Sequence, residues 1–377
     1  MFGTLDITTL QQLWWILCSV VGALFLFLTF VQGGQTLLWQ VARDEREKSL
    51  VINSLGRKWE LTFTTLVLFG GALFAAFPLF YATSFGGAYW VWMLILFTFI
   101  LQAVSYEYRK KPENLLGSKI YEAFLFVNGS AGILLIGAAI GTFFTGSNFV
   151  LSGYNAVTWT SPLRGIEAAF SFFNLSMGLF LVFNARTLGG MYLVNNIDFE
   201  EAPELEMRVR KHCFYSFLCS LPFLLYVLVA LLMIDGFGVD ADGVVSMVAN
   251  KYMNNLIEMP VVAGLLVVGL LLVVVGAALT GLSKERNGIW FGGPGTVLVG
   301  LAILFLAGFN GTAFYPSKVD LQSSLTIYNA SSSHYTLTAM SYVALMIPGV
   351  LGYIAYVWRQ MDMRKIGMDD ISDKKAY

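Results

Sequence analysis

Nine stretches of the sequence stay apolar for 18 residues or more, and none of them contains Lys, Arg, Asp, Glu or His. A helix needs about 20 mostly apolar residues to cross the hydrocarbon core of a bilayer. Helices and closed barrels are the structures that satisfy every backbone polar group in lipid. The pattern therefore predicts an all-α, polytopic membrane protein with nine transmembrane helices at about 13–31, 61–83, 88–106, 123–143, 168–185, 213–234, 260–282, 289–309 and 337–358.

The composition excludes several other classes of protein. Of the 377 residues, 57% are hydrophobic and 12% are charged, whereas soluble globular chains carry about 25% charged residues. The net charge of -1 provides no basic surface for nucleic acid. A soluble enzyme, a disordered chain and a nucleic-acid binder are all excluded. No loop is long enough for a separate soluble domain, so we expect residues 1–377 to form a single transmembrane domain, with a short helix on the outer side at 244–259.

The basic residues orient the predicted helices, because cytoplasmic loops carry an excess of Lys and Arg. Only three of the 23 basic residues, Arg164, Lys251 and Lys318, fall in one set of alternate loops. The remaining 20 fall in the other set, which includes the C-terminal tail. We therefore predict an outside N-terminus and a cytoplasmic C-terminus. The nine helices divide into two four-helix groups plus one.

Residues that could hold a metal or a haem are few. Cys18, Cys213 and Cys219 lie in or at the edge of the apolar stretches and form no CxxC pair, which favours buried, inert thiols. His212 and His334 fall on opposite sides of the predicted membrane, so they cannot ligate one haem together. We predict no catalytic residue, no metal site and no cofactor bound by this chain.

Carboxylates occur only at the rims of the predicted helices, although ion-coupled transport usually places an ionisable group mid-membrane. Glu167 is explained by a surface pair with Arg164, and Glu107 by the basic residues that follow it. Glu60 follows Trp59 and has an apolar run behind it, which favours it as a proton-uptake group, with Glu107 as the weaker candidate. The rim carboxylates considered are Glu60, Glu107, Glu122 and Glu167.

Two segments carry a family resemblance. The chain reads INSLGRKWE at 52–60 and LFGGALFAAFPLFYAT at 68–83, and this resembles subunit II of the cytochrome bd-type quinol oxidases. Length and helix order fit over the whole chain. Further matching residues lie at 14–15, 43–46, 52–54, 70–78, 315–317, 324–333 and 336–338.

The resemblance implies a haem-free subunit of an oxidase in the bacterial inner membrane. In that family a partner, subunit I, carries haem b, with haem d in some members, together with the quinol site. Subunit II packs against subunit I, contributes to a cytoplasmic proton path, and in some members holds a structural quinone. Some members also have a small single-helix subunit. By this resemblance the chain is a non-catalytic subunit of a quinol:oxygen oxidoreductase that stabilises subunit I.

The chain departs from the family where the family carries charge. The acidic motif at the end of the first helix is replaced by 29–35, which contains no acid. The family's Arg late in the third helix aligns with Gln102, and its Trp-Asp pair aligns with Trp59-Glu60. A charge cluster has therefore been exchanged for amides, and only Glu60 carries over the proton role. Two alternatives stay open: a purely structural membrane anchor of the complex, and a stand-alone transporter of small solutes.

Overall fold

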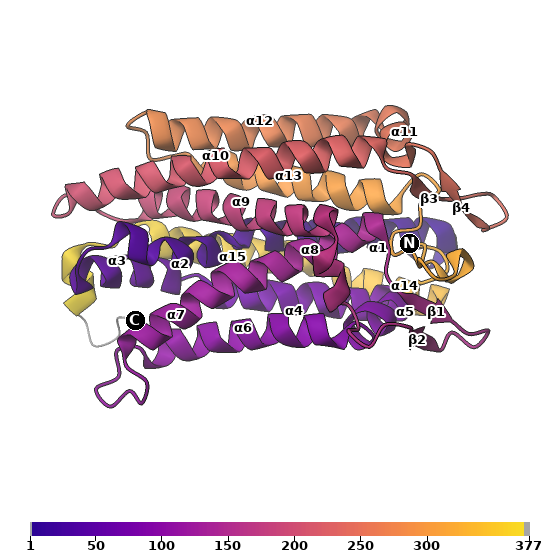
Figure 1. Ribbon diagram of the computed structural model, residues 1–377, viewed down its shortest axis with the longest axis horizontal. Coiled ribbons are helices and arrows are strands. Elements are labelled where there is room, and N and C mark those ends of the chain that lie inside the picture. Colours follow the sequence, from indigo (N-terminus) through magenta and orange to yellow (C-terminus); the bar gives the residue numbers. More distant parts are fainter. Residues whose placement is uncertain (1, 373–377) are drawn as a thin grey trace.

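The computed structural model describes residues 2–372 and consists almost entirely of helices running side by side (Figure 1). Within this range nine helical segments are long and apolar enough to cross a membrane, as predicted. They comprise α1 (Ile7–Leu28) with α2 (Phe30–Val41), α3 (Glu45–Gly56) with α4 (Trp59–Ala76), α6 (Tyr89–Tyr108), α7 (Ser118–Val127) with α8 (Ile133–Thr145), α9 (Phe172–Asn196), α10 (Pro203–Met233), α12 (Pro260–Leu282), α13 (Ile289–Gly308) and α14 (His334–Ala344) with α15 (Ile347–Asp362).

Shorter elements join the long helices. Two turns are π-helical, at Ala82–Gly86 and at Asn128–Gly132, and the second links α7 to α8. The others are α5 (Pro78–Tyr81), α11 (Lys251–Glu258) and 3-10 turns at Phe2–Thr4, Ile166–Phe170, Leu321–Ser323 and Met368–Ser372. Helix α1 begins and α15 ends at opposite ends of the bundle, as an odd number of spans requires (Figure 1). By the positive-inside rule the end with α3 and the α6–α7 loop is cytoplasmic.

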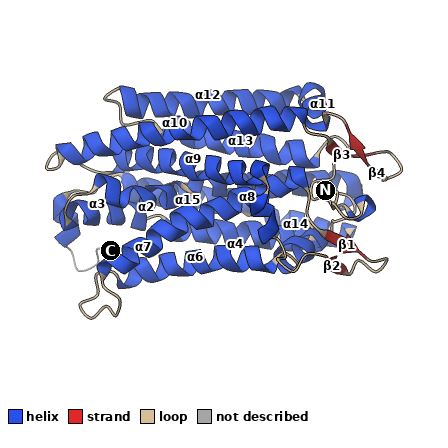
Figure 2. Ribbon diagram, viewed as in Figure 1, coloured by secondary structure: helices blue, strands red, loops and turns tan. Residues whose placement is uncertain are grey.

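Two small antiparallel hairpins lie at the outer end (Figure 2). They pair β1 (Phe149–Leu151) with β2 (Val157–Trp159) and β3 (Gly236–Val239) with β4 (Val245–Val248). The second hairpin corrects the prediction of a helix over 244–259, because only Lys251–Glu258 is helical. The valines of this segment favour the extended strand, in which β-branched side chains pack well.

Helix α9 lies at the centre of the bundle. In its most apolar 18-residue window 78% of the residues are buried, against 11% for the last span. Glycines let α9 approach α2: a Cβ on Gly189 would lie 2.3 Å from the backbone N of Gly34, and one on Gly33 would overlap the Ala185 carbonyl. Small residues serve this purpose where membrane helices touch backbone to backbone. The contact joins the first four spans to the next four.

Candidate functional site

Glu60 lies in the first turn of α4, at the cytoplasmic end, and its side chain is exposed in the isolated chain. The preceding Lys58 is instead 2% exposed and pairs with Asp362 of α15, with 3.0 Å between Nζ and Oδ1. Trp59 stacks its indole on the ring of Tyr106, with 5.6 Å between the ring centroids. Trp59, the residue before Glu60, thus connects α4 to Tyr106 of α6.

Glu107 is on the surface. It lies in the last turn of α6 with 61% of its side chain exposed, and its carboxylate is 3.0 Å from the Lys111 ammonium one helical turn away. Such exposed pairs contribute little, typically about 0–1 kcal/mol. The proton-uptake role of Glu60 and the weaker one of Glu107 stay predictions.

The amides that replace the family's charges come together in one buried cluster between α2, α6 and the π-helical turn. Gln32 donates to Gln102 over 3.3 Å, and Gln35 donates to the Tyr106 hydroxyl over 2.9 Å. We call this set, together with Asn128 and Thr98, the amide column. Asn128 donates to the Thr98 hydroxyl over 3.4 Å. Thr98, Gln102 and Tyr106 lie four residues apart on α6, which runs toward the cytoplasm. Each is therefore about one helical turn closer to the cytoplasm than the one before it.

The amide column is deeply buried and incompletely hydrogen-bonded. Gln32, Gln102 and Asn128 are 0% exposed and Gln35 is 2% exposed. Four of their atoms have no hydrogen-bond partner among the described residues: Gln32 Oε1, Gln35 Oε1, Gln102 Nε2 and Asn128 Oδ1. Buried polar atoms are nearly always paired with protein or ordered water. Exchanging the oxygen and nitrogen of Gln32 or of Gln102 alone would place two acceptors or two donors against each other, and exchanging both would again leave one bond. No exchange of amide atoms therefore adds a bond between the two glutamines.

The π-helical turn brings its backbone against the column. A Cβ on Gly132 would lie 2.4 Å from the Thr98 hydroxyl oxygen, and one on Gly129 would lie 2.1 Å from the carbonyl oxygen of Gln32. π-helical turns inside α-helices occur frequently at functional sites. Here the wider turn places Asn128 in the column while the two glycines admit α6 and α2.

A buried ion cluster closes the column at the cytoplasmic end. The carboxylate of Glu122, 0% exposed, lies 2.7 Å from Arg109 Nη2 and 3.0 Å from Lys48 Nζ, and it accepts from the Trp39 indole over 2.9 Å. Glu45 adds a second carboxylate 2.8 Å from Arg109. The cluster joins α2, α3, α6 and α7. From the sequence Glu122 is predicted only as a rim carboxylate, because its partners Arg109 and Lys48 lie 13 and 74 residues away.

The two histidines contact backbone carbonyls at opposite ends of the bundle. The His212 ring contacts the carbonyl of Arg208 at 2.9 Å within α10, and the His334 ring contacts the carbonyl of Leu5 at 2.8 Å. They lie at the cytoplasmic and the outer end respectively, so no haem can take both as axial ligands. Among residues 2–372 no three His, Cys, Asp or Glu side chains gather as they would around a metal ion. Cys18 and Cys213 are buried, whereas Cys219 is exposed.

The fold and this site define a polytopic, helical membrane protein with a buried amide column and an ion cluster at its cytoplasmic end. The sequence profile of a family described as "Cytochrome bd terminal oxidase subunit II" matches residues 10–361. The chain belongs to this family.

Known relatives match along nearly the full length. The chain is 26% identical to "Cytochrome bd-I ubiquinol oxidase subunit 2" of Escherichia coli strain K12, over 97% of this chain and 98% of that protein. It is 25% identical to "Cytochrome bd ubiquinol oxidase subunit 2" of Bacillus subtilis strain 168, over 95% and 96%. A chain in the structure of bd oxidase from Geobacillus thermodenitrificans superposes with a TM-score of 0.64 at 17% identity, covering 94% of this chain and 98% of that one. The last similarity supports the fold.

Proposed function

We propose that this chain is the haem-free, non-catalytic subunit II of a bacterial bd-type quinol:oxygen oxidoreductase, where it stabilises the haem-bearing subunit I. The observation that carries the proposal is the full-length family match, which covers residues 10–361. The relatives are named as subunits of ubiquinol oxidases, and the two histidines here offer no axial pair. On this proposal the haems b, and d where present, belong to subunit I, and the complex resides in the inner membrane. A structural quinone and a small single-helix subunit are further expectations from the family.

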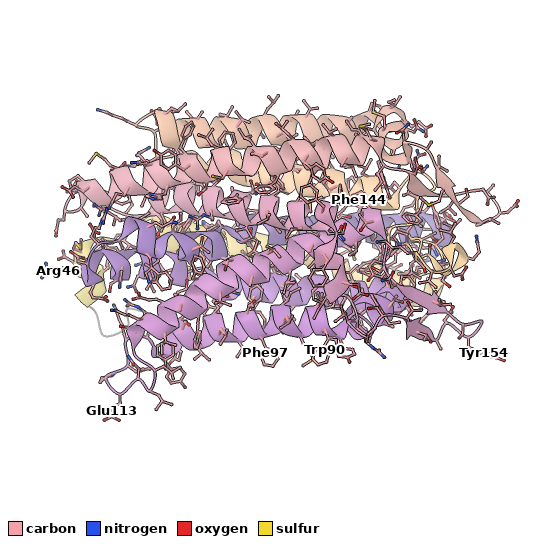
Figure 3. All side chains as sticks on the ribbon, viewed as in Figure 1. Arg46, Trp90, Phe97, Glu113, Phe144 and Tyr154 are labelled. Carbon is pink, nitrogen blue, oxygen red and sulfur yellow. The ribbon has the colours of Figure 1, made fainter. Side chains whose placement is uncertain are left out.

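Two helices expose aromatic side chains suited to contact with subunit I. Helix α6 exposes large aromatic side chains, including Trp90 (42%) and Phe97 (55%), which project away from the bundle (Figure 3). Helix α15 similarly exposes Tyr353 (68%) and Tyr356 (60%). Protein interfaces are enriched in aromatic residues. Helix α12, on the opposite edge from α6 in Figure 1, exposes mainly aliphatic side chains suited to lipid: Val261, Val267, Val268, Leu271, Val274 and Val275.

The test of this assignment is co-purification. A tag on this chain should bring down a multi-helix partner, and the eluate should show haem bands in a reduced-minus-oxidised spectrum. Introducing Arg at Phe97 should abolish capture of the partner, because a charge would be buried at the interface. Introducing Arg at Val268 on α12 is the control for the opposite face. The partner should stay bound to this variant, because that face is expected to contact lipid and not subunit I. A colourless eluate containing this chain alone would support the transporter alternative.

Glu60 is our candidate for proton uptake from the cytoplasm. It lies at the cytoplasmic end next to Trp59, whose ring stacks on Tyr106 of the amide column. In the intact complex, Glu60→Gln should lower turnover and change its pH dependence. Glu113→Gln is a matched control, because Glu113 is an exposed carboxylate on the neighbouring cytoplasmic loop (Figure 3); Glu107→Gln tests the weaker candidate.

A second candidate function is that of a purely structural anchor for subunit I. It is favoured by the exposure of Glu60 and by the replacement of charged groups with amides in the column. Unchanged turnover and an unchanged pH profile in Glu60→Gln, with the complex intact, would decide for this function.

A further inference from the structure

A groove of about 630 Å³ lies between α15 and the cytoplasmic ends of α1, α9 and α13, beside the contact of Trp358 with Phe27. Its apolar wall includes Phe27, Trp290, Ile354 and Trp358, and its polar residues include Arg359 and Lys365. This volume is many times the space that a single buried water needs, so the groove has room for a large apolar group. None of the residues of α15 is buried.

The groove lies between the last helix and the rest of the chain. The α15 residues that line it recur every three or four positions (Leu351, Ile354, Ala355, Trp358, Arg359 and Asp362) and so form one stripe of the helix. The residues facing away include Tyr353 and Tyr356, which are 68% and 60% exposed. A neighbouring subunit would meet this outward face first. The inward stripe therefore requires a narrow, flexible occupant that enters between α15 and its own bundle.

The charge around the groove is positive. Asp362 is its one lining carboxylate, and Lys58, 3.0 Å away, balances its charge. Arg359 and Lys365 make no ion pair with any carboxylate among the described residues, and both are exposed. Two cations thus remain at the cytoplasmic end of an apolar groove. Basic pockets between helices on the cytoplasmic side suit anionic lipid headgroups, and tryptophans such as Trp290 and Trp358 favour the depth of the headgroups.

We propose that this groove binds one anionic phospholipid, whose phosphate lies between Arg359 and Lys365 and whose acyl chains lie against Phe27, Ile354 and Trp358. The lipid would fill the space between α15 and the bundle and so hold the last helix in place. The site is independent of the proton-uptake role of Glu60. A quinone would fit the apolar wall but, being neutral, has no need of the two cations.

The test is quenching of tryptophan fluorescence by brominated lipids in the intact complex, reconstituted into phosphatidylcholine vesicles. Brominated phosphatidylglycerol should quench at far lower mole fractions than brominated phosphatidylcholine. The difference should disappear in Trp290→Phe/Trp358→Phe, which removes the two reporters from the groove. In Arg359→Gln/Lys365→Gln the apparent affinity for phosphatidylglycerol should fall about 30-fold. Lys211→Gln/Lys284→Gln, which removes two cytoplasmic cations outside the groove, should leave it unchanged.

Three results would overturn the proposal. Equal quenching by the two brominated lipids would show ordinary bilayer contact. An unchanged affinity for phosphatidylglycerol in the Arg359/Lys365 variant would show that these two cations do not bind the phosphate, as expected if a neutral quinone is the occupant. A crosslink from Leu351→Cys to the partner subunit would show that protein fills the groove. If the Arg359/Lys365 variant does not assemble, the Trp290→Phe/Trp358→Phe variant still tests the proposal, because it keeps both cations. The stronger quenching by brominated phosphatidylglycerol should then be lost with the two tryptophans.

Discussion

Replacing Glu122 with Gln should destabilise the protein strongly, although it exchanges only one carboxylate oxygen for an amide nitrogen. The variant keeps the shape of the side chain but leaves Arg109 and Lys48, 3% and 15% exposed, without their shared buried carboxylate. Removing one partner of a buried ion pair costs about 3–5 kcal/mol. Because Glu45 still contacts Arg109 at 2.8 Å, we expect the lower end, about 3 kcal/mol. At an unfolding entropy of about 2.1 cal/mol/K per residue, this corresponds to a fall in Tm of about 4 °C for a chain of 377 residues.

The assay is thermal unfolding of the purified complex in detergent, followed by far-UV circular dichroism. Glu107→Gln is the matched control: it also removes a carboxylate from an ion pair, but that pair is more than half exposed and should contribute less than about 1 kcal/mol. Combining Glu122→Gln with Arg109→Gln should cost less than the sum of the two single changes, because the stranded charge is removed. Equal Tm values for Glu122→Gln and Glu107→Gln would show that the burial of the Glu122 carboxylate adds nothing to stability.

Three further predictions follow from packing, hydrogen bonding and burial. Gly189→Ala should lower Tm sharply, because its Cβ would lie 2.3 Å from a backbone atom of α2, whereas Gly264→Ala, with nothing within 4 Å, should not; both are read from the same melting curves. Gln102→Leu should cost about 1–3 kcal/mol by stranding Gln32, and a second change of Gln32 to Leu should recover part of it; a larger loss in the double variant would contradict this. Burial lowers the pKa of Lys251, the first residue of α11 at the outer end. The unfolded chain therefore binds more protons, and the Tm of the wild type relative to Lys251→Met should rise with pH toward about 10.5; a relative Tm that falls with pH would contradict this.

The membrane spans could be predicted from the sequence because lipid imposes a local requirement on it. Each span satisfies its own backbone and needs a continuous apolar run, so hydropathy identifies it without knowledge of its neighbours. The ends were harder to place. Helix α9 continues from the predicted residue 185 to Asn196 because Arg186 reaches polar groups of α2 and α10, including Thr36, Gln40 and Ser216. Helix α10 likewise begins ten residues before the predicted 213, at Pro203, because its charged first turns remain helical in the cytoplasm.

The candidate site could be predicted only in part, because its members are distant in sequence. The comparison with the family indicated that 29–35 and Gln102 had lost charge together, and the structure joins Gln32 to Gln102 across 70 residues. Nothing local distinguishes Glu122 from an ordinary rim carboxylate. Its burial depends on how α2, α3, α6 and α7 meet at the cytoplasmic end. The hairpin at Gly236–Val248 was missed because a helical pattern and a short valine-rich strand are alike over so few residues.

The most direct test of the central claim, membership of a bd-type oxidase as its haem-free subunit, is an affinity purification of this chain from its native membranes with a reduced-minus-oxidised optical spectrum of the eluate. We expect a multi-helix partner at about one copy per copy of this chain, with haem bands that follow the partner when the two chains are separated. Haem that stays with this chain after separation, or a colourless eluate from actively respiring membranes, would contradict it.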